Sequence, residues 1–328
     1  MKIAIITDTW NAVNGVVTTF KQVIQELKSR GHDVLIIDPS KFKTISAPRY
    51  KEIKLAWNIW KIKKILNDFN PDAIHIVTEG PLGLAARCYC RFGKIPHNTS
   101  YHTKFPEYLE TYYFIPKRLS YYILKLFHKF SSKVLVPSNT IKKELEEYNF
   151  KNNIVVWARG VDKSIFKPKQ RNNNERKILL SVSRVSIEKN LDIFCSIKTD
   201  ARKILVGDGP YLETLKKKYS DVEFVGYKFG EELADYYSQA DVFVFTSKTD
   251  TYGVVMLEAM ACGTPIAAYP ITGPIDIITE KSGVMDDNID VAIEKCYALN
   301  RNDVFLCSEH FSWKNTTDIF ENYLVKIT

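Results

Sequence analysis

The sequence lacks paired cysteines and long hydrophobic runs. Its six cysteines are scattered over 328 residues with no CxxC and no paired Cys/His spacing, which argues against a zinc site or disulfide framework and favours a reducing compartment. The longest stretch without charge, Ala259–Ile275, is 17 residues long and contains three prolines, so no transmembrane helix is predicted. The apolar run Ile3–Ile6 is followed at once by Thr7 and Asp8, a pattern that does not fit a signal peptide.

Common nucleotide-binding and repeat signatures are also missing. The chain has neither GxGxxG nor a Walker motif, which weakens the usual dinucleotide and P-loop interpretations. No internal repeat of about 20–50 residues is visible. Apolar residues make up 45% of the chain, with 14 Gly and 13 Pro, which excludes a disordered or collagenous protein. The length predicts two domains of roughly 150–170 residues each.

Short apolar segments alternate with amphipathic helical patterns along the whole chain. This βα rhythm predicts an α/β fold with parallel sheets that are covered on both faces. The expected strands are Ile3–Thr7, Val34–Ile37, Ala73–Val77, Val134–Val136, Ile154–Trp157, Ile178–Val182, Lys203–Val206, Glu223–Val225, Val242–Phe245 and Pro265–Ala268.

A polar, aperiodic stretch, PKQRNNNERK at Pro168–Lys177, interrupts this rhythm and is the best candidate for a linker. We therefore expect a first domain at 1–167 and a second at 168–311. A final helical pattern, roughly Trp313–Val325, carries aromatic residues on one face. It predicts a C-terminal helix within 312–328 that packs back toward the first domain.

The net charge of +8 is unevenly distributed. Residues 1–165 hold 26 Lys/Arg against 14 Asp/Glu, a balance of +12, whereas residues 166–328 hold 20 against 24, a balance of −4. A basic half suggests contact with a polyanion. Nucleic acid, an anionic membrane surface and a phosphorylated substrate remain open on this observation.

Two strand-to-helix loops offer groups that bind anions, because ligands of open α/β sheets sit at the carboxyl ends of the strands. Gly15 lies where a helix begins, so that its backbone can approach a ligand. Arg184 and Lys189 flank the loop SRVSIEKN and are suited to a diphosphate. An ordinary glycine turn and two solvated surface charges are the alternatives.

The loop and helix SKTDTYGVVMLEAMACGTP, Ser247–Pro265, carry the strongest signal. Asp250 follows a strand, Gly253–Val255 begin a helix, and Glu258 lies on its first turns. Helix N-terminal amides bind phosphate oxygens, and two carboxylates eight residues apart can accept hydrogen bonds from hydroxyl groups. This set predicts a sugar-nucleotide site.

At this loop the chain resembles the retaining GT-B glycosyltransferases of family 4. Their E-x7-E signature appears as Asp250-x7-Glu258 within TDTYGVVMLEAMACGTPIAAY, with Asp in place of the first Glu. Further matching segments are TDTWNAVNGVVTT near the start, TEGPLGLAAR at 78–87, SYHTKFPEY at 100–108, ARGVD at 158–162 and VGDGP at 206–210. The similarity covers nearly the whole chain. It implies two Rossmann-like domains that face each other across a cleft. The variant is similar to the subgroup of diacylglycerol glycosyltransferases, sulfoquinovosyltransferases and GDP-mannose-dependent mannosyltransferases.

The resemblance implies roles at the sugar and ribose. His102, at a strand end in SYHT, would contact the donor sugar near its anomeric carbon, and Gly15 would approach the diphosphate and the reacting sugar. Asp250 would hold sugar hydroxyls, and Glu258 would hold the ribose. The shorter Asp250 puts the identity of the sugar in doubt.

The resemblance also implies how the leaving group is bound. Arg184 and Lys189 would neutralise the diphosphate, with main-chain amides at Gly253, Val254 and Val255 completing the phosphate site. No DxD motif lies in this pocket, so no metal or other cofactor is expected. Attack is expected on the same face of the sugar, with the departing phosphate as base.

Two basic segments of the first domain carry aromatic residues at helical spacing, KEIKLAWNIWKIKK at Lys51–Lys64 and PKRLSYYILKLFHKFSSK at Pro116–Lys133. Such helices suit the interface of an anionic bilayer; a core-facing stripe with a solvated lysine face is the alternative. Because the first domain of this fold binds the acceptor, the pattern favours a lipid acceptor. The candidate acceptor or membrane-surface residues are Trp57, Trp60, Lys61, Lys117, Arg118, Tyr121, Tyr122 and Lys125.

These observations favour a peripheral membrane enzyme on the inner face of the cell membrane. The resemblance to lipid glycosyltransferases implies that it would move glucose or glucuronic acid from a UDP-sugar to diacylglycerol or another lipid. A GDP-mannose-dependent α-mannosyltransferase acting on a lipid or glycan is the alternative within the class. A nucleic-acid-binding protein lacks any recognition-helix, RNP or zinc-finger pattern, so no nucleic-acid partner is expected. A phosphorylase or an epimerase on the same scaffold is the remaining alternative.

Overall fold

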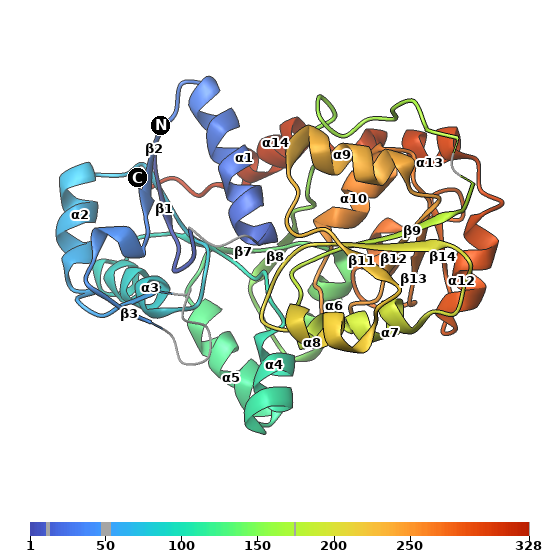
Figure 1. The fold of residues 1–328 in the computed structure, drawn as a ribbon. Coiled ribbons are helices and arrows are strands. Elements are labelled where there is room, and N and C mark those ends of the chain that lie inside the picture. Colours follow the sequence, from blue (N-terminus) through green and yellow to red (C-terminus); the bar gives the residue numbers. More distant parts are fainter. Residues whose placement is uncertain (11–13, 47–53, 174, 328) are drawn as a thin grey trace. The chain divides into compact units, whose positions relative to one another are not determined.

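The computed structural model describes residues 1–10, 14–46, 54–173 and 175–327. The chain divides into two compact units: unit 1 comprises Met1–Ala158 with Trp313–Thr328, and unit 2 comprises Arg159–Ser312. Each unit is built on its own six-stranded sheet (Figure 1). In the described residues, no helix is long and apolar enough to cross a membrane.

Unit 1 contains a parallel sheet of order β2-β1-β5-β6-β7-β8 and a separate antiparallel hairpin, β3-β4. Its elements are β1 (Lys2–Ile6), α1 (Gly15–Ser29), β2 (Asp33–Ile37), η1 (Pro39–Lys41), β3 (Thr44–Ser46), β4 (Lys54–Ala56), α2 (Lys61–Phe69), β5 (Ala73–Ile76), α3 (Pro81–Gly93), β6 (Asn98–Ser100), α4 (Phe105–Tyr113), α5 (Lys117–His128), β7 (Lys133–Val136), α6 (Asn139–Glu147), β8 (Asn153–Val156) and α14 (Trp313–Tyr323).

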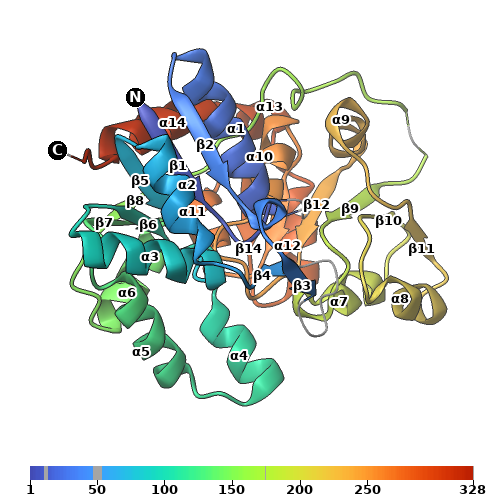
Figure 2. The same ribbon diagram turned by 90° about the vertical axis from the view of Figure 1, so that its left-hand side faces the viewer.

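The sheet of unit 1 is buried on both faces, as its apolar strands require. Alternate residues of β1 enter different cores, with Ile3 and Ile5 on the side of α1 and α14, and Ala4 and Ile6 on the side of α2 and α3. Helices α1 and α14 lie side by side (Figures 1 and 2). The final helix is therefore part of the core of unit 1.

Unit 2 contains a parallel sheet of order β11-β10-β9-β12-β13-β14. Its chain order is 3-2-1-4-5-6, the Rossmann arrangement. Its elements are β9 (Ile178–Val182), η2 (Ile187–Lys189), α7 (Leu191–Ser196), β10 (Arg202–Val206), α8 (Leu212–Lys218), β11 (Val222–Phe224), α9 (Gly230–Gln239), β12 (Val242–Phe245), α10 (Val254–Ala261), β13 (Ile266–Ala268), α11 (Pro274–Ile277), β14 (Gly283–Met285), α12 (Ile289–Cys296), α13 (Arg301–Cys307) and η3 (Ser308–His310).

The unit boundary lies earlier than the predicted division after residue 167. The structure divides the chain between Ala158 and Arg159. The polar stretch Pro168–Lys177 is attached to unit 2, because Lys169 pairs with Asp235 at 2.7 Å and Arg171 pairs with Asp241 at 2.8 Å. Its polarity reflects ion pairs with the middle of α9 and with the residue directly before β12, and the linker assignment is therefore wrong for these residues.

The basic segment Lys51–Lys64 is not one helix. Residues 51–53 lie outside the described part of the chain, and the rest forms β4, a turn and the first residues of α2. Trp57 and Trp60 stand before α2 as an exposed edge-to-face pair with ring centroids 5.6 Å apart. Pairing of β4 with β3 across the hairpin overrides the helical spacing of the lysines.

Tyr121 does not belong to the exposed face of α5, contrary to its predicted surface role. Its ring is 1% exposed and stacks on Tyr148 at 3.6 Å. Its hydroxyl donates to Glu144 and, at 3.3 Å, to Glu107. The helical period places Tyr121 on the core side of α5 and the neighbouring Tyr122 in solvent.

We predict that Tyr121→Phe lowers the free energy of unfolding by about 1–3 kcal/mol, because it leaves two carboxylates without their shared donor. Tyr122→Phe is the matched control and should change it by less than about 0.5 kcal/mol. Urea unfolding followed by circular dichroism measures both. Equal effects of the two substitutions would contradict the assignment of Tyr121 to the core.

Candidate active site

The strand order of unit 2 reverses between β9 and β12, and the loops that follow these two strands are bonded to each other. The Thr246 hydroxyl donates to the Lys189 carbonyl oxygen at 2.9 Å, and the Thr249 hydroxyl donates to the Glu188 carbonyl oxygen at 3.4 Å. A reversal of this kind is where open α/β sheets bind ligands. The structure therefore brings the two predicted donor loops together at one sheet edge.

Lys189 and Asp250 form the charged centre of this junction. The Lys189 Nζ donates to Asp250 Oδ1 at 2.5 Å, and both side chains are largely shielded from water. Each charge is balanced by the other. A ligand that uses both groups must offer an anion to the lysine and hydroxyl donors to the carboxylate.

A glycine turn after β10 packs against the backbone of the Arg184–Lys189 loop. The Val185 N–H donates to the Asp208 carbonyl at 2.9 Å. A Cβ on Gly207 would lie 1.8 Å from the Ser183 carbonyl oxygen, and Gly207 has φ +137°. The VGDGP motif therefore permits close backbone packing that holds the loop carrying Arg184, which is half-buried.

Helix α10 begins at the same edge. Its N-cap is Gly253 at φ +97°, a backbone conformation that favours glycine. Glycine has no side chain to cap the first-turn amides, and the positive end of the helix dipole lies at Val254 and Val255. These three residues thus form an anion-attracting end beside Asp250.

Glu258, one turn further along α10, is half-buried and accepts a hydrogen bond from the Tyr237 hydroxyl at 2.9 Å. Burial raises the pKa of its carboxyl to about 7, and the Tyr237 bond acts in the opposite direction. The group therefore titrates near neutral pH. It supplies a hydrogen-bond acceptor whose charge depends on pH.

The two predicted residues of unit 1 lie at the carboxyl edge of its own sheet. His102 follows β6, is 8% exposed, and its ring contacts Phe20 edge-on with centroids 5.7 Å apart and Trp157 at 6.1 Å. Gly15 begins α1, where the Asn14 side chain accepts from the Val17 N–H at 3.0 Å. Residues 11–13 of this loop lie outside the described part of the chain.

The predicted surface residues of unit 1 occupy two separate places. Trp57, Trp60 and Lys61 are exposed around the start of α2. On α5, Arg118 and Tyr122 are exposed, and the side chains of Lys117 and Lys125 are partly exposed.

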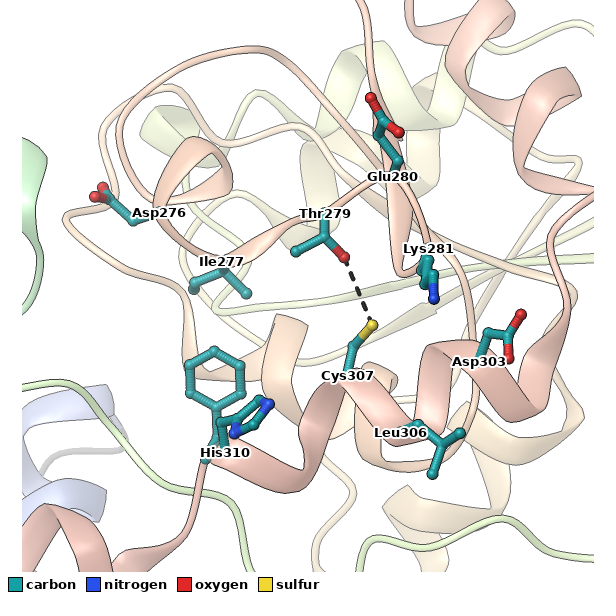
Figure 3. Close-up of a pocket in the computed structure, with 10 residues that line it drawn as sticks. Asp276, Ile277, Thr279, Glu280, Lys281, Asp303, Leu306, Cys307 and His310 are labelled. Carbon is teal, nitrogen blue, oxygen red and sulfur yellow. Dashed lines mark hydrogen bonds between the residues drawn. The ribbon is translucent and has the colours of Figure 1, made fainter.

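A cavity of about 710 Å³ in unit 2 holds none of the predicted residues. It lies between the Asp276–Lys281 segment and α13 with η3, where the Thr279 hydroxyl and Cys307 Sγ are 3.5 Å apart (Figure 3). Its lining residues are Asp276, Ile277, Thr279, Glu280, Lys281, Asp303, Leu306, Cys307, His310 and Phe311.

Family models and sequence relatives agree on the class of protein. Residues 13–164 match the model described as Glycosyltransferase Family 4, and residues 162–294 match the model for Glycosyl transferases group 1. The alpha-monoglucosyldiacylglycerol synthase of Streptococcus pneumoniae is 30% identical over 314 residues, which cover 82% of this chain and 71% of that protein. The chain belongs to the family 4 glycosyltransferases. Its enzyme class follows from this membership.

Two further similarities extend along the glycosyltransferase. A GDP-mannose-dependent alpha-mannosyltransferase of Corynebacterium glutamicum is 29% identical over 321 residues, covering 88% of this chain and 78% of that protein. The structure of HepE from Anabaena in complex with UDP and glucose superposes with a TM-score of 0.75, at 15% identity and 98% coverage of both chains. The fold is accordingly that of the GT-B glycosyltransferases.

Two buried residues of the glycosyltransferase's unit 2 were not singled out by the sequence. Arg159 is 5% exposed beside Tyr252, and burial lowers the pKa of its guanidinium to about 10, so it is charged at neutral pH. Tyr237 lies on α9, 21 positions before Glu258. The buried positions Leu233, Ala234 and Tyr237 follow a helical period, which is the one sequence signal that marks Tyr237 as internal.

We predict that Gly207→Ala destabilises the glycosyltransferase by more than about 3 kcal/mol, because positive φ and a backbone clash add together. Gly226→Ala is the matched control: Gly226 has φ +72°, but a Cβ added there would meet no atom within 4 Å, and the substitution should cost about 1–2 kcal/mol. Urea unfolding compares them. A Gly207 variant no less stable than the Gly226 variant would contradict the supporting role of the glycine turn.

Proposed function

We propose that the enzyme transfers glucose or glucuronic acid from a UDP-sugar to diacylglycerol at a membrane surface, with retention of configuration and without a metal ion. The observation that carries the donor assignment is the single edge of unit 2 where Lys189, Asp250 and the N-terminus of α10 meet. A cation and helix amides suit a diphosphate, and a carboxylate suits sugar hydroxyls. A sugar nucleotide supplies both kinds of partner from adjacent atoms.

The reaction that these groups support needs no protein nucleophile. The acceptor hydroxyl oxygen bonds to the anomeric carbon as the bond from that carbon to the phosphate oxygen breaks. The hydroxyl proton passes to an oxygen of the departing phosphate, on the same face of the sugar. Arg184, Lys189 and the α10 amides stabilise the negative charge that develops on the leaving diphosphate, which is the task a divalent cation would otherwise perform.

The remaining donor contacts follow the family pattern. We assign the ribose to Glu258 and sugar hydroxyls to Asp250, with His102 and Gly15 as contacts to the reacting sugar. Support for a UDP-sugar comes from the solved HepE complex with UDP and glucose. Support for a lipid acceptor comes from the 30% identical diacylglycerol enzyme of Streptococcus pneumoniae.

An exposed stripe on α5 supports acceptor delivery from a bilayer. Four apolar side chains at helical spacing on α5 and one in the turn that follows it are 38–57% exposed, and we call them the α5 stripe: Leu119, Tyr122, Ile123, Leu126 and, after the helix, Phe130. Cations surround its end, with the Arg91 guanidinium 4.0 Å and the Arg87 guanidinium 5.3 Å from the Phe130 ring centroid. Exposed apolar side chains with cations beside them suit the surface of an anionic membrane.

A GDP-mannose-dependent α-mannosyltransferase acting on a lipid or glycan is the second candidate. It is favoured by the 29% identity to the Corynebacterium glutamicum mannosyltransferase over 88% of this chain. The donor loops described above serve either nucleotide sugar, because they address the diphosphate, the ribose and the sugar rather than the base.

The decisive experiment is product analysis with diacylglycerol liposomes and a panel of UDP- and GDP-sugars in the presence of EDTA. We expect one UDP-hexose to give an α-linked glycolipid, with the anomeric configuration read by NMR. A mannolipid from GDP-mannose would establish the second candidate instead. Activity that EDTA abolishes and Mg²⁺ restores would overturn metal independence, and a β-linked product would overturn retention.

The same assay tests the leaving-group residues. Arg184→Ala combined with Lys189→Ala should lower turnover by about 100-fold or more, because it removes the positive charge that balances the leaving diphosphate. Lys216→Ala combined with Lys217→Ala, on the exposed side of α8, is the matched loss of two charges and should have little effect. A double variant that folds and retains activity within a few-fold of wild type would remove both residues from the site.

Membrane contact is tested by flotation with liposomes that contain anionic lipid. Ile123→Asp, in the α5 stripe, should reduce binding by about tenfold or more, since it introduces a like charge and removes apolar contact. Leu306→Asp, an exposed leucine of unit 2, is the control and should leave binding unchanged. Binding of the wild type should weaken as salt is raised. Equal binding by both variants would contradict the α5 stripe as the contact.

A further inference from the structure

The Tyr237 phenol is held in one place by the end of α9. Tyr237 is fully buried, and its ring packs edge-on against Phe243 at 5.6 Å and Phe166 at 6.0 Å. Its carbonyl oxygen accepts from the Thr264 hydroxyl at 2.5 Å. The Arg301 guanidinium donates to the Thr264 hydroxyl at 3.0 Å. These contacts hold the ring in one orientation. The buried hydroxyl must therefore find its hydrogen-bond acceptor in the direction in which the ring points.

The acceptor is Glu258, whose Oε2 accepts a hydrogen bond from the Tyr237 hydroxyl at 2.9 Å. We propose that Tyr237 is a positioning residue of the donor site, which fixes the rotamer of the Glu258 carboxylate, so that the other oxygen is presented to the ribose of the nucleotide. The inference rests on the proposed role of Glu258 and adds Tyr237 as the residue that orients its carboxylate. A donor to one oxygen orients a carboxylate and favours its charged form.

The need for such a group follows from the surroundings of Glu258. Burial raises the pKa of this carboxyl to about 7 even with the Tyr237 donor in place, so loss of the donor would shift the carboxyl further toward the neutral acid at neutral pH. A ribose hydroxyl donates more strongly to a carboxylate than to a carboxylic acid. The phenol opposes the effect of burial.

Other ionisable groups on the elements packed against α10 are few. Strands β12 and β13 carry none. Helix α9 brings Tyr237, together with Glu231, Glu232, Asp235 and Tyr236 on its remaining positions, and Cys262 follows α10 itself. The groups on α13 and η3 are Arg301, Asp303, Cys307, Glu309 and His310. Within the described residues, the hydrogen bond to the Glu258 carboxylate comes from Tyr237.

The test is calorimetric binding of UDP-glucose and GDP-mannose, without acceptor, from about pH 6 to about pH 8.5. Both probes carry a diphosphate that is esterified at each end and does not titrate in this range. In the wild type, affinity should rise with pH through the ionisation of Glu258. Tyr237→Phe keeps the ring and removes the donor, so the midpoint of this rise should move up by about one pH unit. Affinity should fall several-fold at the acid end and return toward wild type at the alkaline end.

Two variants separate the possible outcomes. Tyr236→Phe, the neighbouring and partly exposed tyrosine, should leave the profile unchanged. Glu258→Gln should give weak binding that does not vary with pH. If Glu258→Gln binds both probes as well as wild type, the donor role of Glu258 is wrong. If Glu258→Gln weakens binding but Tyr237→Phe leaves the midpoint in place, or lowers affinity equally at every pH, the positioning role of Tyr237 alone is overturned.

The wild-type profile provides a check that does not depend on the folding of the Tyr237 variant. An affinity that is flat across the whole range in the wild type would overturn the inference by itself, since Glu258 would then not change charge in a way the nucleotide detects.

Discussion

The ion pair between Lys189 and Asp250 holds together two loops that are distant in sequence and adjacent in space. Strands β9 and β12 are neighbours in the sheet of unit 2 although β10 and β11 lie between them in the chain, and the pair closes at 2.5 Å where their loops meet. A ligand that replaces this contact must compensate a cation and a carboxylate at once. A free phosphate compensates the cation alone, and a free sugar compensates the carboxylate alone. A sugar nucleotide satisfies both, because its phosphate is bonded directly to the anomeric carbon of the sugar.

Beneath this junction, the site depends on groups that a ligand would not touch. The glycine turn after β10 lets two backbones pack closely under the Arg184 loop. Arg301 binds the carbonyl oxygens of Ser238 and Ala240 at 2.9 and 2.6 Å, which fixes the end of α9 and with it the Tyr237 ring. Buried polar networks are rigid when each member has its partners. The position of Glu258 therefore depends, through Tyr237, on interior bonds that a ligand would not touch.

The sequence predicted the parts of the protein that repeat a simple pattern. Apolar strands such as β9 and β12 were predicted because strands buried on both faces are continuously apolar. The residues that follow these strands led to the prediction of donor loops; the structure brings the two loops together, and their role stays a prediction. The hairpin β3-β4 and the edge strand β14 were not predicted, since each is short and depends on pairing rather than on composition. Tyr121 and Tyr122 are adjacent residues of the same type, and the structure buries the first against Tyr148 and leaves the second exposed. Charged residues of Pro168–Lys177 indicated a linker because their partners on α9 and before β12 were not visible in the sequence.

The α5 stripe and the cations beside it call for one explanation rather than two. Nucleic acid would compensate Arg87, Arg91 and the lysines of α5, but it offers no apolar surface to Leu119, Ile123 and Leu126, which stand 41–57% exposed. An apolar protein partner would cover those side chains and leave the arginines against a surface without counter-charge. An anionic bilayer presents headgroup charge and hydrocarbon together, and so offers a partner to the guanidinium groups and to the apolar side chains of α5. The combination of exposed apolar side chains and cations therefore supports the proposal of a lipid acceptor over a nucleic-acid or purely apolar protein partner.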